Sequence, residues 1–174
     1  MNQQRRHGIA GIGIKYGIIQ GVLSFGVFFA GTLAGMAQNR ALTAANALLL
    51  IVLMVLAHRE FKRTNDGMMT YPQGLGSGTL LSSVGALIRG VLMYVYVKYI
   101  NTGYLAGVIQ AQQAALAQRG ITGAQAQVAL GMTSSITTPV GIAVTSLVTG
   151  VIVGFIVALI VSIFTQKADP MAVT

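Results

Sequence analysis

The sequence contains no cysteine and very little charge of either sign. Without cysteine the chain can form no disulfide, no Cys-ligated zinc or iron–sulfur site and no thiol nucleophile. Aspartate and glutamate together number 3, and charged residues make up 8% of the chain, against roughly a quarter in an ordinary soluble domain. The composition therefore excludes an ordinary water-exposed surface over most of the molecule.

Long apolar segments dominate the sequence instead. Hydrophobic residues make up 54% of the chain, and the mean hydropathy is +0.73. A spanning helix needs about 17–25 predominantly apolar residues. We therefore predict an all-α integral membrane protein, a four-helix bundle forming one transmembrane domain over residues 1–174 in contact with the lipid bilayer. Its expected spans are about 14–36, 41–57, 78–100 and 140–164.

Most basic residues fall on one side of these spans. Arg5, Arg6 and Lys15 flank the first span, a basic cluster separates the second from the third, and Lys167 follows the fourth. Basic residues near span ends favour the cytoplasmic side. We therefore expect a bacterial inner-membrane protein with both termini in the cytoplasm, and a net charge of +8 that reflects topology rather than nucleic-acid binding. The first span resembles a signal peptide, which we expect to be retained as a helix.

Two connections carry recognisable local signals. In the cytoplasmic connection, Asn65-Asp66-Gly67 predicts a turn, and Tyr71-Pro72 predicts an extended entry into the third span. The outer connection, about 101–135, reads as two short helices broken at Gly120, with capping-box spacing between Thr122 and Gln125. We therefore predict an extracytoplasmic helical hairpin between the third and fourth spans.

Small residues recur at helical spacing within the spans. Residues three or four apart share one helix face, and small side chains there let two helices approach closely in lipid. We predict that this set serves helix packing inside the bundle or contact with another membrane subunit. With Arg89, the set comprises Gly13, Gly17, Gly21, Gly78, Ser82, Gly85, Gly150 and Gly154.

Arg89 falls near the middle of the third predicted span, on the same face as Ser82 and Gly85. A central arginine costs about 2.5–3.5 kcal/mol to insert, so it should have polar partners. Carbonyls and the intramembrane polar side chains are one possibility, a carboxylate of another chain or an anionic lipid is a second, and a path for a solute is a third. The polar side chains considered are Gln20, Ser24, Thr145 and Thr149.

Groups that support catalysis or metal binding are scarce. His7 and His58 lie at or beyond predicted cytoplasmic helix ends and have no metal-ligand spacing. No acid lies within a predicted span to relay protons or bind sodium. We therefore expect no enzymatic activity, no catalytic residues, no metal and no cofactor.

The order of features resembles a family of small bacterial four-helix membrane proteins catalogued as a domain of unknown function. The similarity rests on Arg59-Glu60, Asp66-Gly67, Tyr71 and the glycines Gly74 and Gly78 before the third span. The resemblance implies the fold over nearly the whole chain but no activity and no site residues. The outer hairpin here is rich in alanine and glutamine, whereas family members usually carry glutamate there.

Two functional hypotheses follow. The first is a small accessory or structural subunit of a larger membrane complex, because the chain lacks catalytic groups and carries many small-residue faces. We expect some of these faces to contact a partner, since four helices offer few places to bury them all. The alternative is a small transporter or channel in which Arg89 lines a path for an anion or another solute.

Overall fold

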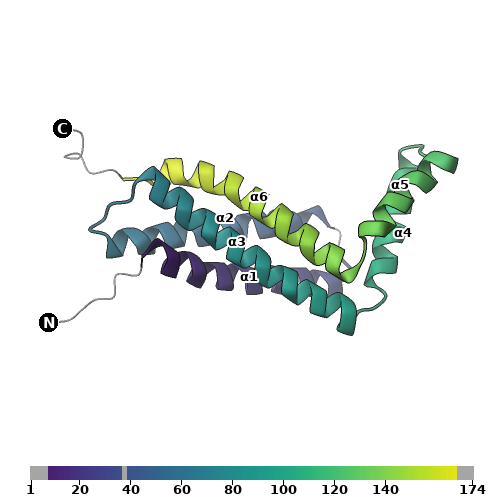
Figure 1. The fold of residues 1–174 in the computed structure, drawn as a ribbon, viewed down its shortest axis with the longest axis horizontal. Helices are drawn as coiled ribbons and strands as arrows, with labels where there is room; N and C mark the ends of the chain where they lie inside the picture. The colour runs from purple at the N-terminus through teal and green to yellow at the C-terminus, as the bar shows by residue number, and fades with distance from the viewer. Residues whose placement is uncertain (1–7, 37–38, 168–174) are drawn as a thin grey trace. The chain divides into compact units, whose positions relative to one another are not determined.

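A computed structural model describes residues 8–36 and 39–167 (Figure 1). These residues form two compact units. The first contains the described parts of Met1–Arg89 and Leu147–Thr174, and the second contains Gly90–Ser146. Each unit is described by itself below.

The described residues form 4 helices that are long and apolar enough to span a membrane. They are α1 (Ile9–Leu33), α2 (Arg40–Thr64), α3 (Tyr71–Val95, extended by the π-helical turn η1, Tyr96–Ile100) and α6 (Pro139–Thr165). A helix of 25 residues, the length of α2, is about 37 Å long, compared with about 30 Å for the hydrocarbon core of a bilayer. The all-α, four-span fold predicted from the sequence is therefore confirmed.

Three helix boundaries differ from the prediction by five residues or more, and the first of them is the start of α1, at Ile9 rather than near residue 14. The second helix continues to Thr64 rather than ending near Ala57, and the third begins at Tyr71 rather than near Gly78. The predicted boundaries followed the end of each apolar run, whereas a helical backbone continues through polar residues as long as its own hydrogen bonds do.

The predicted extended entry at Tyr71-Pro72 is wrong, because both residues are helical. Thr70 N–H donates to Gln73 Oε1 at 2.9 Å, which is one half of a capping box. Pro72 lies in the first turn, where its missing N–H costs no helical hydrogen bond.

The predicted turn before α3 is present. Gly67 N–H donates to Lys62 O at 2.8 Å, and Asp66 and Gly67 both have positive φ, 51° and 78°. Glycine adopts this left-handed conformation without penalty, and aspartate is one of the few other residues that tolerate it. The connection between α2 and α3 is therefore a tight hairpin instead of a long loop.

Within the first unit, glycines of α1 pack on α3. The Cβ that an alanine would add at Gly13 lies 3.1 Å from Leu80 Cβ, at Gly17 2.7 Å from Val84 Cβ, and at Gly21 2.7 Å from Ile88 Cβ. Both partners advance by four residues together, so the helices run parallel. Glycine is required here because any larger side chain would force them apart. The contacts are therefore a regular glycine-to-aliphatic series.

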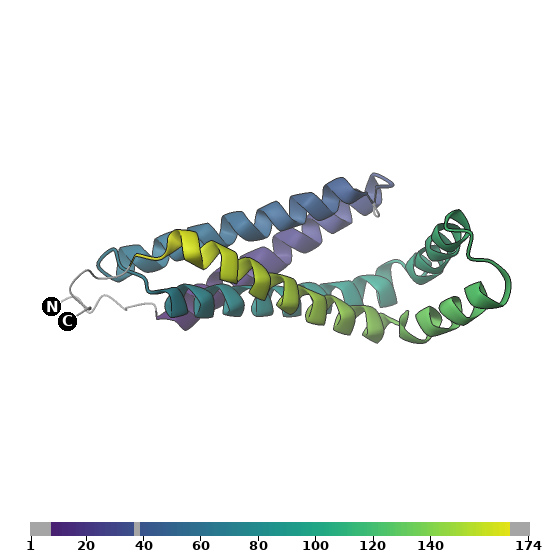
Figure 2. The same ribbon diagram turned by 90° about the horizontal axis from the view of Figure 1, so that it is seen from above.

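A second small-residue interface joins α3 to α6. Gly74 packs against Ser162, Gly78 against Ala158 Cβ, Ser82 against Gly154, and Ala86 against Gly150. The numbers rise by four on α3 and fall by four on α6, so this pair is antiparallel. These small residues of α3 and α6 are thus in contact with each other inside the chain. Figure 2 shows the start of α1, the α2–α3 turn and the end of α6 at one end of this unit.

The second unit contains two short helices, α4 (Tyr104–Gln118) and α5 (Gly123–Ile136), joined by a turn in which Gly120 has φ +72°. Gln112 Nε2 donates to Thr133 Oγ1 at 3.2 Å between them. Thr122 is the N-cap of α5, but its side chain makes no capping hydrogen bond. The capping box predicted from Thr122 and Gln125 is therefore wrong, since Gly123, with φ +65°, turns the backbone at that point.

Candidate functional site

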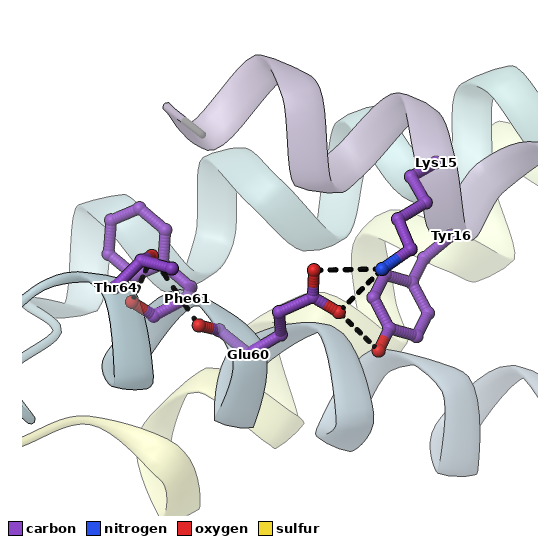
Figure 3. Close-up of polar contacts among 5 residues, drawn as sticks. All are labelled: Lys15, Tyr16, Glu60, Phe61 and Thr64. Carbon is purple, nitrogen blue, oxygen red and sulfur yellow. Dashed lines mark hydrogen bonds and ion pairs between the residues drawn. The ribbon is translucent and has the colours of Figure 1, made fainter. Parts of the chain in front are cut away.

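The end of the first unit that contains the α2–α3 turn gathers most of its charged and polar contacts. We call it the turn end. There, Lys15 Nζ lies 2.8 Å from Glu60 Oε1 and 2.9 Å from Oε2, and Tyr16 O–H donates to Glu60 Oε2 at 2.8 Å (Figure 3). The Glu60 side chain is 25% exposed and that of Lys15 is 55% exposed. These contacts fix α1 against α2.

His58 lies on the next face of α2 and is fully buried. Its Nε2 is 3.0 Å from Gly74 O on α3, and its Nδ1 is 2.7 Å from Thr165 Oγ1 at the end of α6. A carbonyl oxygen can only accept, so Nε2 carries a proton and donates it. Sequence reasoning placed this residue at a helix end and gave it no structural role. His58 therefore connects α2 to both α3 and α6 through hydrogen bonds.

The end of α6 is held by two further contacts. Lys62 Nζ donates to Thr165 O at 3.0 Å, at the carboxyl end of the helix, where a positive charge is favourable. Met69 N–H donates to Lys167 O at 2.9 Å, and Lys167 N–H donates back to Met69 O at 2.8 Å. This antiparallel bridge ties the α2–α3 turn to the residues that follow α6, so all four long helices meet at the turn end.

A smaller polar group lies deeper in the same unit. Ser24 O–H donates to Asn46 Oδ1 at 2.7 Å, and Asn46 Nδ2 donates to Leu42 O at 3.1 Å. Gln20 packs against Gly85, and its Oε1 is buried without a hydrogen-bond partner among the described residues. Asn46 was not predicted from the sequence as part of a polar contact, although a single amide in an apolar helix indicates one.

Arg89 is half-buried on α3, one helical turn beyond Gly85. Because α3 begins at Tyr71 and continues through η1 to Ile100, Arg89 lies about 27 Å from the amino end of the helix and about 16 Å from its carboxyl end. Ser24, one proposed partner, already bonds to Asn46. Thr145 and Thr149 are exposed on α6.

The predicted small-face residues divide between two contacts instead of sharing one. Gly78 and Ser82 face α6, whereas Gly85 faces Gln20 and Gly17 of α1. The prediction that Ser82 and Gly85 share one helix face is wrong. Residues three apart differ by about 60° around a helix, which is enough for them to contact different neighbours. Within residues 8–36 and 39–167, no three His, Asp or Glu side chains are grouped as a metal site would require.

The helices α4 and α5 carry no fully buried residue. On α5, Val128, Met132 and Ile136 are 61%, 71% and 61% exposed, and they recur every four residues along one face. We call these residues the α5 stripe. Gln127 lies off the stripe and is also exposed. An apolar stripe on a helix with no other burial is a surface that can contact another hydrophobic body.

The fold and these contacts define a class, a helical membrane protein with four spans. The chain belongs to the family described as "Protein of unknown function (DUF4199)", whose model matches residues 15–167. The resemblance inferred from the sequence is thereby confirmed. Neither a curated protein nor a solved structure matches the chain.

Proposed function

We propose that the protein is a small, non-catalytic accessory subunit of a larger complex in the bacterial cytoplasmic membrane. The α5 stripe is the observation that carries this proposal. Val128, Met132 and Ile136 lie on a helix that buries no residue completely. Burying such side chains gives about 1.5–3 kcal/mol each, so a partner that covers the stripe would bind through it.

We therefore place the partner surface on the α5 stripe and not on the glycine faces. The faces of Gly17, Gly21, Gly78 and Gly154 are occupied by other helices of the same chain. They organise the bundle of the first unit. In the proposed topology both termini are cytoplasmic and the hairpin is extracytoplasmic. The excess of basic residues at the turn end supports this orientation.

A pair of substitutions tests the proposal. Met132→Glu places a charge on the α5 stripe, and Gln127→Glu places the same charge on the same helix away from it. After mild-detergent extraction of native membranes, we expect the wild type and Gln127→Glu to migrate in a large assembly with defined partner chains. Met132→Glu should migrate as the free protein. A wild type that migrates only as a monomer or a simple homo-oligomer contradicts the proposal.

A second candidate is a small transporter or channel, and one observation favours it. Gln20 Oε1 is buried without a hydrogen-bond partner among the described residues, against Gly85 and one turn from Arg89. A permeating anion or solute could use such donors and acceptors. Because the chain has no cysteine, Gln20→Cys alone can be probed with a charged thiol reagent in membranes. Labelling would place water at this depth, and its absence would remove this candidate.

A further inference from the structure

The outward face of α2 changes from apolar to basic at one point. Leu48, Val52 and Leu56 are 62%, 46% and 41% exposed and lie along one face of the helix. The next positions on that face are Arg59 and Arg63, both exposed. Apolar residues exposed along a spanning helix face hydrocarbon, so the change marks where the hydrocarbon ends.

The other helices change at the same height. On α6 the exposed Ile160 and Phe164 are followed by Lys167. The 2.7 Å contact between His58 Nδ1 and Thr165 Oγ1 places this point of α6 level with the corresponding point of α2. A flat membrane surface requires such agreement between helices that are distant in sequence. The change from apolar to basic residues therefore places the membrane boundary of the first unit at the turn end.

The α1 helix agrees with this boundary. Its exposed apolar residues Ile18 and Val22 follow Lys15 along the helix, away from the turn end. The ion pair of Lys15 with Glu60, at 2.8 Å, places the lysine one residue beyond Arg59 on α2. Basic residues on α1, on α2 and after α6 therefore lie near the same end of the unit.

The neighbouring charges do not neutralise the two arginines. Glu60 is turned toward α1, where it contacts Lys15 and Tyr16 (Figure 3). Lys62 is directed at the Thr165 carbonyl. Among the described residues, neither Arg59 nor Arg63 makes a hydrogen bond or ion pair that the structure records. Two positive charges are thus left at the level of the lipid headgroups.

We propose that Arg59 and Arg63 bind the phosphate of an anionic phospholipid at this boundary. Arg63 lies about 6 Å further along the axis than Arg59, at about 1.5 Å per residue. Helical side chains lean toward the amino terminus of their helix, and on α2 that direction leads back into the bilayer. Arg63 therefore reaches back toward the level of Arg59, and the two guanidinium groups can share one headgroup. A guanidinium fork matches phosphate oxygens in bidentate geometry.

The test measures lipid selectivity of the full-length chain. The protein is reconstituted into phosphatidylcholine nanodiscs containing a minor fraction of phosphatidylglycerol, and retained lipids are counted by native mass spectrometry. Arg59→Gln/Arg63→Gln is compared with Arg40→Gln, which removes an exposed charge from the opposite end of α2. A basic residue near an anionic surface contributes about 1 kcal/mol, or roughly five-fold in affinity.

We expect the wild type and Arg40→Gln to retain phosphatidylglycerol preferentially, and the double variant to lose about 25-fold of that preference. Inorganic phosphate at millimolar concentration should not displace the lipid, because it lacks the acyl chains that pack on Leu56 and Val52. Circular dichroism checks that the double variant keeps its helix content. Equal retention in the wild type and the double variant would overturn the proposal. So would an equal loss in Arg40→Gln, which would indicate a response to net charge alone.

Discussion

Gly17→Ala tests the packing of α1 on α3 most sharply. The added Cβ would lie 2.7 Å from Leu81 O and 2.7 Å from Val84 Cβ. Ordinary contacts between carbon atoms are about 3.5–4.0 Å, so α1 and α3 would have to separate by roughly 1 Å. Overpacking of this kind costs about 1–3 kcal/mol. The atoms in the way belong to a helical backbone and a β-branched side chain, neither of which can rotate aside.

Gly26→Ala is the matched control on the same helix. Nothing lies within 4 Å of the position where its Cβ would be. Both substitutions gain the same helix propensity, about 1 kcal/mol for glycine to alanine. The difference between the two variants therefore isolates the packing term. We expect Gly17→Ala to be less stable than Gly26→Ala by about 1–3 kcal/mol.

The assay is reversible unfolding by SDS in mild-detergent micelles, followed by circular dichroism. Gly26→Ala should unfold at the same SDS fraction as the wild type or a higher one. Gly17→Ala should unfold at a lower SDS fraction than Gly26→Ala. If the two variants unfold together, α1 does not pack on α3 through this glycine, and the parallel glycine-to-aliphatic contact is refuted.

Two further predictions concern the turn end. Glu60→Gln should lower the free energy of unfolding by about 0.2–1 kcal/mol through loss of the Lys15 ion pair, with the deficit shrinking as salt is added. The same deficit at low and high salt would show that the ion pair is not its source. His58→Ala should cost more, because it removes two hydrogen bonds, at about 0.5–1.5 kcal/mol each, and leaves a cavity in place of a fully buried side chain. A free energy of unfolding equal to that of the wild type would contradict the connecting role assigned to His58.

The sequence was sufficient to predict the four spans, because hydrophobic run length and lipid thickness are directly related. It was also sufficient to predict the turn at Asp66-Gly67, because few residues tolerate positive φ. Helix ends were less predictable. The Thr70-x-x-Gln73 capping box extends α3 by a local hydrogen bond that hydropathy does not report.

The contacts of each helix face could not be predicted in the same way. Four-residue spacing indicates that Gly17, Gly21 and Gly154 approach another helix, but not which one. The answer depends on long-range pairing, in which α3 offers aliphatic residues to α1 and small residues to α6. His58 illustrates the same limit. Its partners Gly74 and Thr165 lie 16 and 107 residues away in the sequence.

The central claim, that the α5 stripe contacts another membrane subunit, can be tested most directly by site-specific photo-cross-linking in native membranes. A photoreactive residue replaces Met132 in one variant and Gln127 in another. We expect a cross-linked product between position 132 and a different protein chain, with little or none from position 127. Cross-links from position 132 to lipid alone, or to a second copy of this chain alone, would contradict it.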